Sequence, residues 1–236
     1  MNHLHSLVLA ITLLVGSVSI ATAQNLQKGF DAYNAGDYQT ALQQWRPLAN
    51  QGNATAQTML ALMYAEGEGV LQDDAEAVKW WRLAAEQGMA PAQYHLGGKC
   101  FNGNGVPQDY AEAAKWYRLA AEQGYTYAQY DLGQMYRKGE GVLQDYAEAA
   151  KWYRLAAEQG MASAQNNLGA MYQLGAGVLQ SNVMAHMWYN IASANGDPKS
   201  GEKRDERAGL MSQADISKAQ EMARECMGSN YQNCGE

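Results

Sequence analysis

The histidines are the first residues to consider for acid–base or metal chemistry. His95 and His186 are the two that follow residue 23, and neither belongs to a His-x-x-x-His pair or lies near a cluster of cysteines. A zinc site needs three or four converging ligands, which isolated histidines do not supply. We therefore predict no metal site, no cofactor and no catalytic residue in this chain.

Paired carboxylates recur along the chain in the pattern Asp-x-x-Glu. The pairs are Asp73/Glu76, Asp109/Glu112 and Asp145/Glu148. Acid–base catalysis needs one unequal pair in a pocket, so a series of equivalent pairs favours a structural role. The pattern is that of a capping box, in which the Asp oxygen accepts a backbone N–H at the start of a helix and the Glu side chain reaches back.

The cysteines indicate one disulfide. Cys226 and Cys234 lie close together near the C-terminus, and an oxidising compartment would favour a bond between them that tethers residues 227–233 to the preceding helix. Cys100 stands where similar segments of the chain carry tyrosine, so we expect a buried thiol there, outside any disulfide.

A 36-residue period organises most of the sequence. Glycines at positions 52, 88, 124, 160 and 196 mark it, and they delimit repeats 1 to 4, residues 53–88, 89–124, 125–160 and 161–196. Each repeat reads as two helices joined by a Gly-x-Gly-Val loop, which lacks the GK[ST] ending of a phosphate-binding loop. One such helix pair cannot bury its apolar face alone, so neighbouring repeats must stack into an α-solenoid.

The ends of the chain depart from this period. Residues 24–52 read as an N-terminal tetratricopeptide-like starter repeat, with Trp45 at the position of Trp81. Residues 197–236 read as C-terminal capping helices, because terminal repeats need a polar outer face.

The blocks closely resemble the Sel-one-like repeat (SLR) family, a relative of the tetratricopeptide repeat. Matching features of repeat 3 are Leu132-Gly133, Gly139-Glu140-Gly141-Val142, Asp145-Tyr146 and Trp152-Tyr153. The resemblance implies an all-α, right-handed superhelix of stacked helix-turn-helix repeats. It also implies that a secreted bacterial member acts as an adaptor in envelope assembly, secretion, signalling or host contact.

Residues 1–23 read as a signal peptide. They carry no charged side chain, and Leu7–Val15 is an apolar run too short to span a bilayer. Ala21-Thr22-Ala23 supplies the small-x-small pattern for cleavage after Ala23, although the segment lacks Lys and Arg. We therefore expect a periplasmic or secreted protein that is not inserted in the membrane after cleavage.

The charge of the chain limits its partners. A formal net charge of −7 with no polybasic cluster argues against binding to nucleic acid or to anionic membranes. We expect a monomer that binds a protein or peptide partner.

A stripe on the first helices is the candidate binding site. Its positions vary between repeats while the second helices are nearly identical, and by analogy with tetratricopeptide repeats it faces a concave groove. Tyrosine and arginine are frequent anchors of interfaces. The predicted partner-binding residues are Tyr94, Phe101, Tyr127, Tyr130, Gln134, Arg137, Asn166 and Gln173.

Two other functions remain open. In a module that binds peptidoglycan or another glycan, the same tyrosines would stack on sugar rings. A secreted hydrolase would need a pocket that gathers His95 with acids such as Asp131. Some secreted SLR proteins are linked to β-lactam hydrolysis, but they carry a cysteine pair in each repeat, which this sequence does not.

Overall fold

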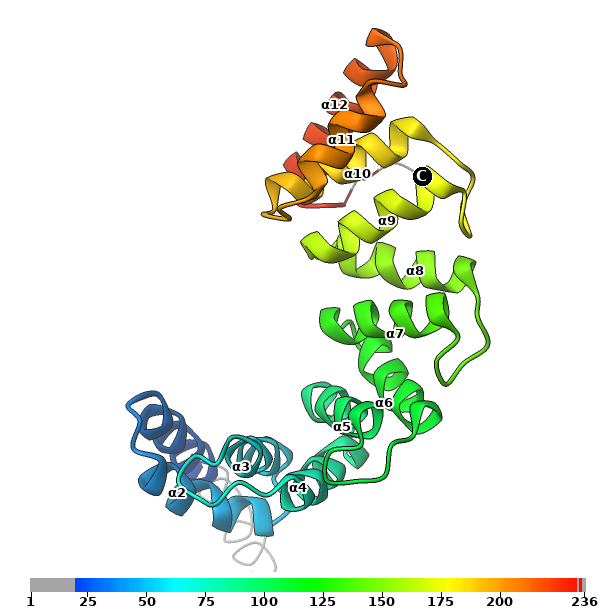
Figure 1. The fold of residues 1–236 in the computed structure, drawn as a ribbon. Coiled ribbons are helices and arrows are strands. Elements are labelled where there is room, and N and C mark those ends of the chain that lie inside the picture. Colours follow the sequence, from blue (N-terminus) through cyan, green and yellow to red (C-terminus); the bar gives the residue numbers. More distant parts are fainter. Residues whose placement is uncertain (1–19, 233, 235–236) are drawn as a thin grey trace, which may run out of the picture. The chain divides into compact units, whose positions relative to one another are not determined.

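The computed structural model describes residues 20–232 and residue 234. Residues 1–19, most of the expected signal peptide, lie outside the described residues. Every regular element among the described residues is a helix (Figure 1). The all-α class and the stacking of helix pairs predicted from the period are thus confirmed. The chain divides into two compact units, unit 1 up to Gln108 and unit 2 from Asp109 onward, with the boundary in the loop of repeat 2.

The described part of unit 1 begins with a helix over residues 20–34, which includes both sides of the expected cleavage position. The helices that follow are α2 (Tyr38–Asn50), α3 (Ala54–Glu66), α4 (Asp74–Glu86) and α5 (Ala90–Asn102). Trp45 is fully buried, lies edge-on to Phe30 at 5.2 Å between ring centroids, and donates its indole N–H to the Leu26 carbonyl over 3.2 Å. These contacts join the first helix to α2 as a helix pair ahead of repeat 1.

Unit 2 contains the second helix of repeat 2, repeats 3 and 4, and the C-terminal helices. They are α6 (Tyr110–Glu122), α7 (Thr126–Lys138), α8 (Tyr146–Ala157), α9 (Ala162–Leu174), α10 (Asn182–Ala194), α11 (Ser200–Ala208) and α12 (Gln213–Gly228). Each helix of repeats 3 and 4 packs on its neighbour in chain order, and both α11 and α12 pack on α10 (Figure 1).

Aspartate caps the second helix in repeats 1 to 3, and Ser181 caps it in repeat 4. In repeat 3 only half of the predicted capping box forms. Asp145 accepts the N–H groups of Ala147 and Glu148 at 2.8 and 3.0 Å. Its own N–H donates to the carbonyl of Tyr136 at 3.0 Å, and Glu148 pairs with a lysine of its own helix instead of reaching back. The loop returns the chain to the end of α7, where a backbone carbonyl replaces the expected Glu oxygen.

The second glycine of each loop is required by a close approach between repeats. Gly141 has φ of +71°, and a Cβ atom there would lie 2.1 Å from the carbonyl oxygen of Tyr110 at the start of α6. Any side chain would push the loop away from the preceding repeat. The loop is also fixed by Gln144, whose amide donates to the carbonyl of Arg137 at 2.9 Å.

A buried glutamine holds successive repeats together. The set is Gln57, Gln93, Gln129 and Gln165, and each donates to an alanine carbonyl eight residues earlier. In repeat 3, Gln129 donates to Ala121 at 3.2 Å and accepts the side-chain amide of Gln159 at 2.7 Å. Burial without these partners would be unfavourable, so the pair fixes the position of one repeat against the next.

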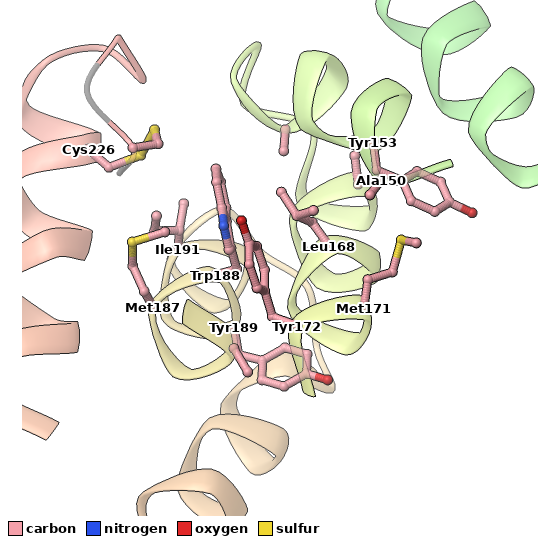
Figure 2. Packing of buried hydrophobic residues seen from close by; sticks show 14 of the residues in the cluster. Ala150, Tyr153, Leu168, Met171, Tyr172, Met187, Trp188, Tyr189, Ile191 and Cys226 are labelled. Atoms are coloured by element: carbon pink, nitrogen blue, oxygen red, sulfur yellow. A yellow bond between two sulfur atoms is a disulfide. The ribbon is translucent and has the colours of Figure 1, made fainter. Parts of the chain in front are cut away.

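The C-terminal helices cover the outer face of α10. Positions that are exposed Lys151 and Leu155 on α8 become Met187 and Ile191 on α10, and both are fully buried. They point toward the segment that carries Cys226, whereas Tyr189 lies on the other side of α10 (Figure 2). The small residues of α12 pack into the same core, which includes Ala219, Ala223 and Cys226.

Helix α11 takes the position of a fifth first helix. Its buried Ser200 lies 36 residues after Ala164, the buried alanine of α9. A disulfide joins Cys226 of α12 to Cys234, which follows the helix, with an S–S distance of 1.95 Å. The segment between them places the Tyr231 hydroxyl within 2.8–3.0 Å of the Asn195 amide, which in turn donates to Gln165 at 2.9 Å. At the last buried glutamine, Gln165, the amide partner is therefore Asn195, which the Tyr231 hydroxyl holds in place.

Candidate functional site

The predicted stripe is divided between the two units. Tyr94 and Phe101 lie on α5 of unit 1, and both are half-buried. The other six residues lie on α7 and α9 of unit 2.

In unit 1, His95 is packed in a stack of rings. Its ring lies parallel to that of Trp81, with centroids 5.0 Å apart, and Tyr94 meets it edge-on at 5.5 Å. Lys99 lies over the same Trp81 ring at 5.6 Å and pairs with Asp74 at 2.6 Å. Burial, with a smaller effect of Lys99, lowers the pKa of His95 and favours the neutral ring.

The histidines show no arrangement for metal binding. His186 is 2% exposed on α10, and burial together with Arg204 lowers its pKa, partly offset by Asp205. Within residues 20–232 and at 234, no group of three or more His, Cys, Asp or Glu side chains could hold a metal ion. His95 belongs to unit 1 and Asp131 to unit 2.

In unit 2, the structure brings three of the predicted residues into one polar network. Gln134 is at its centre: its amide donates to the Tyr130 hydroxyl at 3.0 Å, and its oxygen accepts the Tyr153 hydroxyl at 2.6 Å and the Arg137 Nε at 3.1 Å. Asn167 of α9 donates to the Tyr130 hydroxyl at 3.5 Å. The ring of Tyr130 lies 5.8 Å from that of Tyr153, so Tyr130 also contributes to packing between α7 and α8.

Tyr127 is the most exposed of the predicted aromatic residues, with 57% of its surface accessible. It borders a shallow groove at the ends of repeats 3 and 4. The other residues that line the groove are Thr126, Gln159, Gly160, Met161, Ala162, Ser163, Gly196, Asp197 and Pro198. Large exposed aromatic rings beside a groove are typical of contact surfaces.

Asn166 and Gln173 have partners inside unit 2. The Asn166 oxygen accepts the Ser200 hydroxyl at 3.2 Å and the Lys203 ammonium at 2.8 Å, which attaches α11 to α9. The Gln173 oxygen accepts the Tyr189 hydroxyl at 2.7 Å. These two residues therefore position neighbouring helices, a role that the variable stripe did not indicate.

Tyr153 and Tyr189 were not among the predicted site residues, yet their hydroxyls contact predicted ones. Burial raises the pKa of each to about 12, so both phenols are neutral donors at physiological pH. The second helices looked uniform, which concealed this role. The sequence feature that could have indicated it is the tyrosine that unit 2 carries at the position of Trp81. Its hydroxyl can form hydrogen bonds that the indole at this position cannot.

The arginines of the second helices serve a separate inter-repeat contact. Arg118 donates to the Tyr136 hydroxyl and lies over its ring, with 5.7 Å from guanidinium carbon to ring centroid. Arg154 makes the same contacts with Tyr172, at 5.9 Å over the ring. Cys100 occupies the equivalent tyrosine position in repeat 2 and is fully buried.

Among residues 20–232, no helix is both long enough and apolar enough to cross a membrane. Comparisons with known proteins identify the repeats. Residues 54–89, 90–125, 126–161 and 162–197 each match the Sel1 repeat, in a frame one residue later than the one set by the glycines.

Solved structures agree with this match. A protective antigen from uropathogenic Escherichia coli that displays an SLR fold is 32% identical, with a TM-score of 0.78 over 95% of this chain and 53% of its own. A Sel1 repeat protein from Oxalobacter formigenes is 32% identical, with a TM-score of 0.72 over 88% of this chain and 84% of its own.

A shorter match concerns a curated protein of Rhizobium leguminosarum, an exopolysaccharide production negative regulator. It is 45% identical over 49 residues, which are 21% of this chain and 18% of the regulator. The chain thus spans about half of the E. coli antigen, 53%, and a small part of the regulator. With four matched repeats that cover more than half of its residues, the chain belongs to the Sel1 repeat family.

Proposed function

We propose that this chain is a non-catalytic scaffold of the cell envelope or secreted space that holds a protein or peptide partner on the first-helix face of its repeats. Sel1 repeat proteins generally mediate protein–protein interactions, and their scaffolds are typically non-catalytic. The envelope location rests on the signal-like residues 1–23.

The observation that carries this proposal is the contrast between the two kinds of position in the repeat. Positions that recur have structural partners: the buried glutamines and the Arg118–Tyr136 and Arg154–Tyr172 pairs join successive repeats, and the aspartates cap helices. The varying positions of α7 instead present Tyr127 and Arg137 to solvent. Residues that the fold does not require, and that are rich in interface-forming types, are the ones a partner would contact.

Affinity capture from solubilised cell envelope tests the proposal. Three tagged forms of the chain are compared by mass spectrometry: wild type, Tyr127→Ala/Arg137→Glu, and a control, Tyr146→Ala/Arg224→Glu. The control changes the same residue types at exposed positions on α8 and α12. Tyr127 is preferred to Tyr130 because the Tyr130 ring packs against Tyr153 and its loss would also disturb the fold.

We expect a protein that wild type and control retain and that the Tyr127→Ala/Arg137→Glu variant loses. Equal retention by all three forms would contradict this location of the site. Absence of any specifically retained protein would contradict the scaffold function. Binding of purified peptidoglycan without a protein partner would favour the glycan-binding alternative, with Tyr127→Ala as the informative variant.

A further inference from the structure

Arg137 is not needed by the repeat. The equivalent positions of the other repeats are Ala65, Phe101 and Gln173, and each of these helices ends at the same left-handed glycine as α7. A cation near a helix C-terminus has a favourable interaction with the helix dipole. The sister helices α3 and α9 end without a basic residue in their last turn, so the dipole does not explain the arginine.

The guanidinium of Arg137 is oriented but not neutralised. Its Nε donates to the Gln134 oxygen, which is itself held by the Tyr153 hydroxyl, while the side chain is exposed. In the part of the chain that the structure describes, no carboxylate forms an ion pair with it. By contrast, Arg118 and Arg154 are engaged by tyrosines of the following repeat.

We infer that Arg137 is the anchor for a side-chain carboxylate in an extended, acidic segment of the protein partner. The inference rests on the proposed function and names the chemistry of its partner. The guanidinium also lies close to the Tyr153 hydroxyl, where it partly offsets the rise in pKa that burial causes. The remaining N–H groups on its exposed side can donate to an Asp or Glu carboxylate, a role for which arginine is better suited than lysine. Tyr127, on an earlier turn of α7 and 57% exposed, offers apolar ring surface to residues of the same segment.

The charge of the whole chain makes this preference local. At a net charge of −7, the protein exerts no long-range attraction on an acidic partner. A preference for acidic segments would therefore depend on Arg137 itself and would disappear when this residue is replaced.

A library of random 12-residue peptides displayed on phage, selected against the full chain, tests the inference. Wild type, Arg137→Gln and Arg137→Glu are compared; glutamine is the natural residue at the equivalent position 173, so Arg137→Gln is compatible with the fold. We expect wild type to enrich peptides with Asp or Glu at one fixed position and Arg137→Glu to enrich Lys or Arg there.

Individual peptides then give a double-mutant cycle by fluorescence polarisation. The Kd of an enriched peptide and of its Glu→Gln or Asp→Asn counterpart is measured with wild type and with Arg137→Gln. Either single change, in the peptide or at Arg137, should weaken binding about tenfold, as expected for the loss of a charge-assisted hydrogen bond. Making both changes together should weaken binding little further than one change alone. Independent effects, or enrichment without an acidic position, would overturn the inference.

The outcomes separate this inference from the proposed function. Peptides that lose affinity with Tyr127→Ala but show no acidic preference would leave the scaffold proposal intact and refute the role of Arg137. A wild-type chain that enriches no peptide family would count against both.

Discussion

Replacing Gln129 by methionine should destabilise unit 2 through lost hydrogen bonds rather than lost packing. Methionine has a similar shape but can neither donate to the Ala121 carbonyl nor accept the Gln159 amide. Each of those partners keeps one other bond: Ala121 O accepts the Gly124 N–H at 3.0 Å, and the Gln159 amide donates to Gly124 O at 3.1 Å. Neither is left wholly unsatisfied, so the cost is that of two ordinary hydrogen bonds.

At about 1 kcal/mol for each bond, the loss in unfolding free energy should be about 2 kcal/mol. For a chain of this size that corresponds to a fall in Tm of about 6 °C. Gln129→Glu should cost more, because an oxygen then faces the Ala121 carbonyl where an N–H donor stood.

Thermal unfolding followed by circular dichroism, with urea titration for the free energy, measures both variants. Gln220→Met makes the same chemical change at an exposed position of α12 and should stay within about 0.5 kcal/mol of wild type. The reasoning is refuted if Gln129→Met is as stable as wild type, or if Gln129→Glu is no worse than Gln129→Met.

Three further measurements address other contacts. Lys99→Met alone should lower the unfolding free energy by about 1 kcal/mol in urea titrations, because half-buried Asp74 loses its cation. Adding Asp74→Tyr gives the Met and Tyr that stand 36 residues later, at Met135 and Tyr110, and should recover the loss. Additive losses from the two changes would exclude this coupling. Burial lowers the pKa of His186 below the ordinary histidine value of about 6.5, so unfolding takes up a proton and the stability should fall as the pH drops below about 6.5. His186→Val should reduce that fall, and an unchanged pH profile of stability would contradict the lowered pKa. Reduction of the Cys226–Cys234 disulfide should lower the unfolding free energy by about 2–3 kcal/mol. The Tm of the double variant Cys226→Ser/Cys234→Ser should not change with reductant, and a change would show that the reductant acts elsewhere.

The helices, their caps and the loops could be predicted from sequence because local chemistry determines them. Asp145 precedes a helix that it caps, and Gly141 stands where the backbone has a positive φ. The final helix begins after Ser212, whose hydroxyl accepts the Asp215 N–H. These features depend on interactions within a few residues, which a single sequence displays.

Contacts between repeats were harder to foresee. The recurrence of Gln129 and Gln159 was visible, but their bond joins residues 30 positions apart, and only the stacking of repeats reveals it. The same limit applied to the site, since variability indicated Asn166 and Gln173 but not that α10 and α11 already occupy their polar atoms. Likewise, the role of the Tyr153 hydroxyl depends on a glutamine 19 residues away.

The covering of α10 has a consequence for the modular growth of the array. Repeat 3 carries exposed Lys151 and Leu155 on its second helix, so that helix tolerates an uncovered outer face. In the segment from α10 onward, Met187 and Ile191 are covered by α12, so α10 and α12 form one structural block that ends the stack of repeats. Duplication of residues 125–160 should therefore lengthen the stack by one repeat. Duplication of residues 161–196 would instead leave the apolar outer face of the first copy of α10 exposed to solvent.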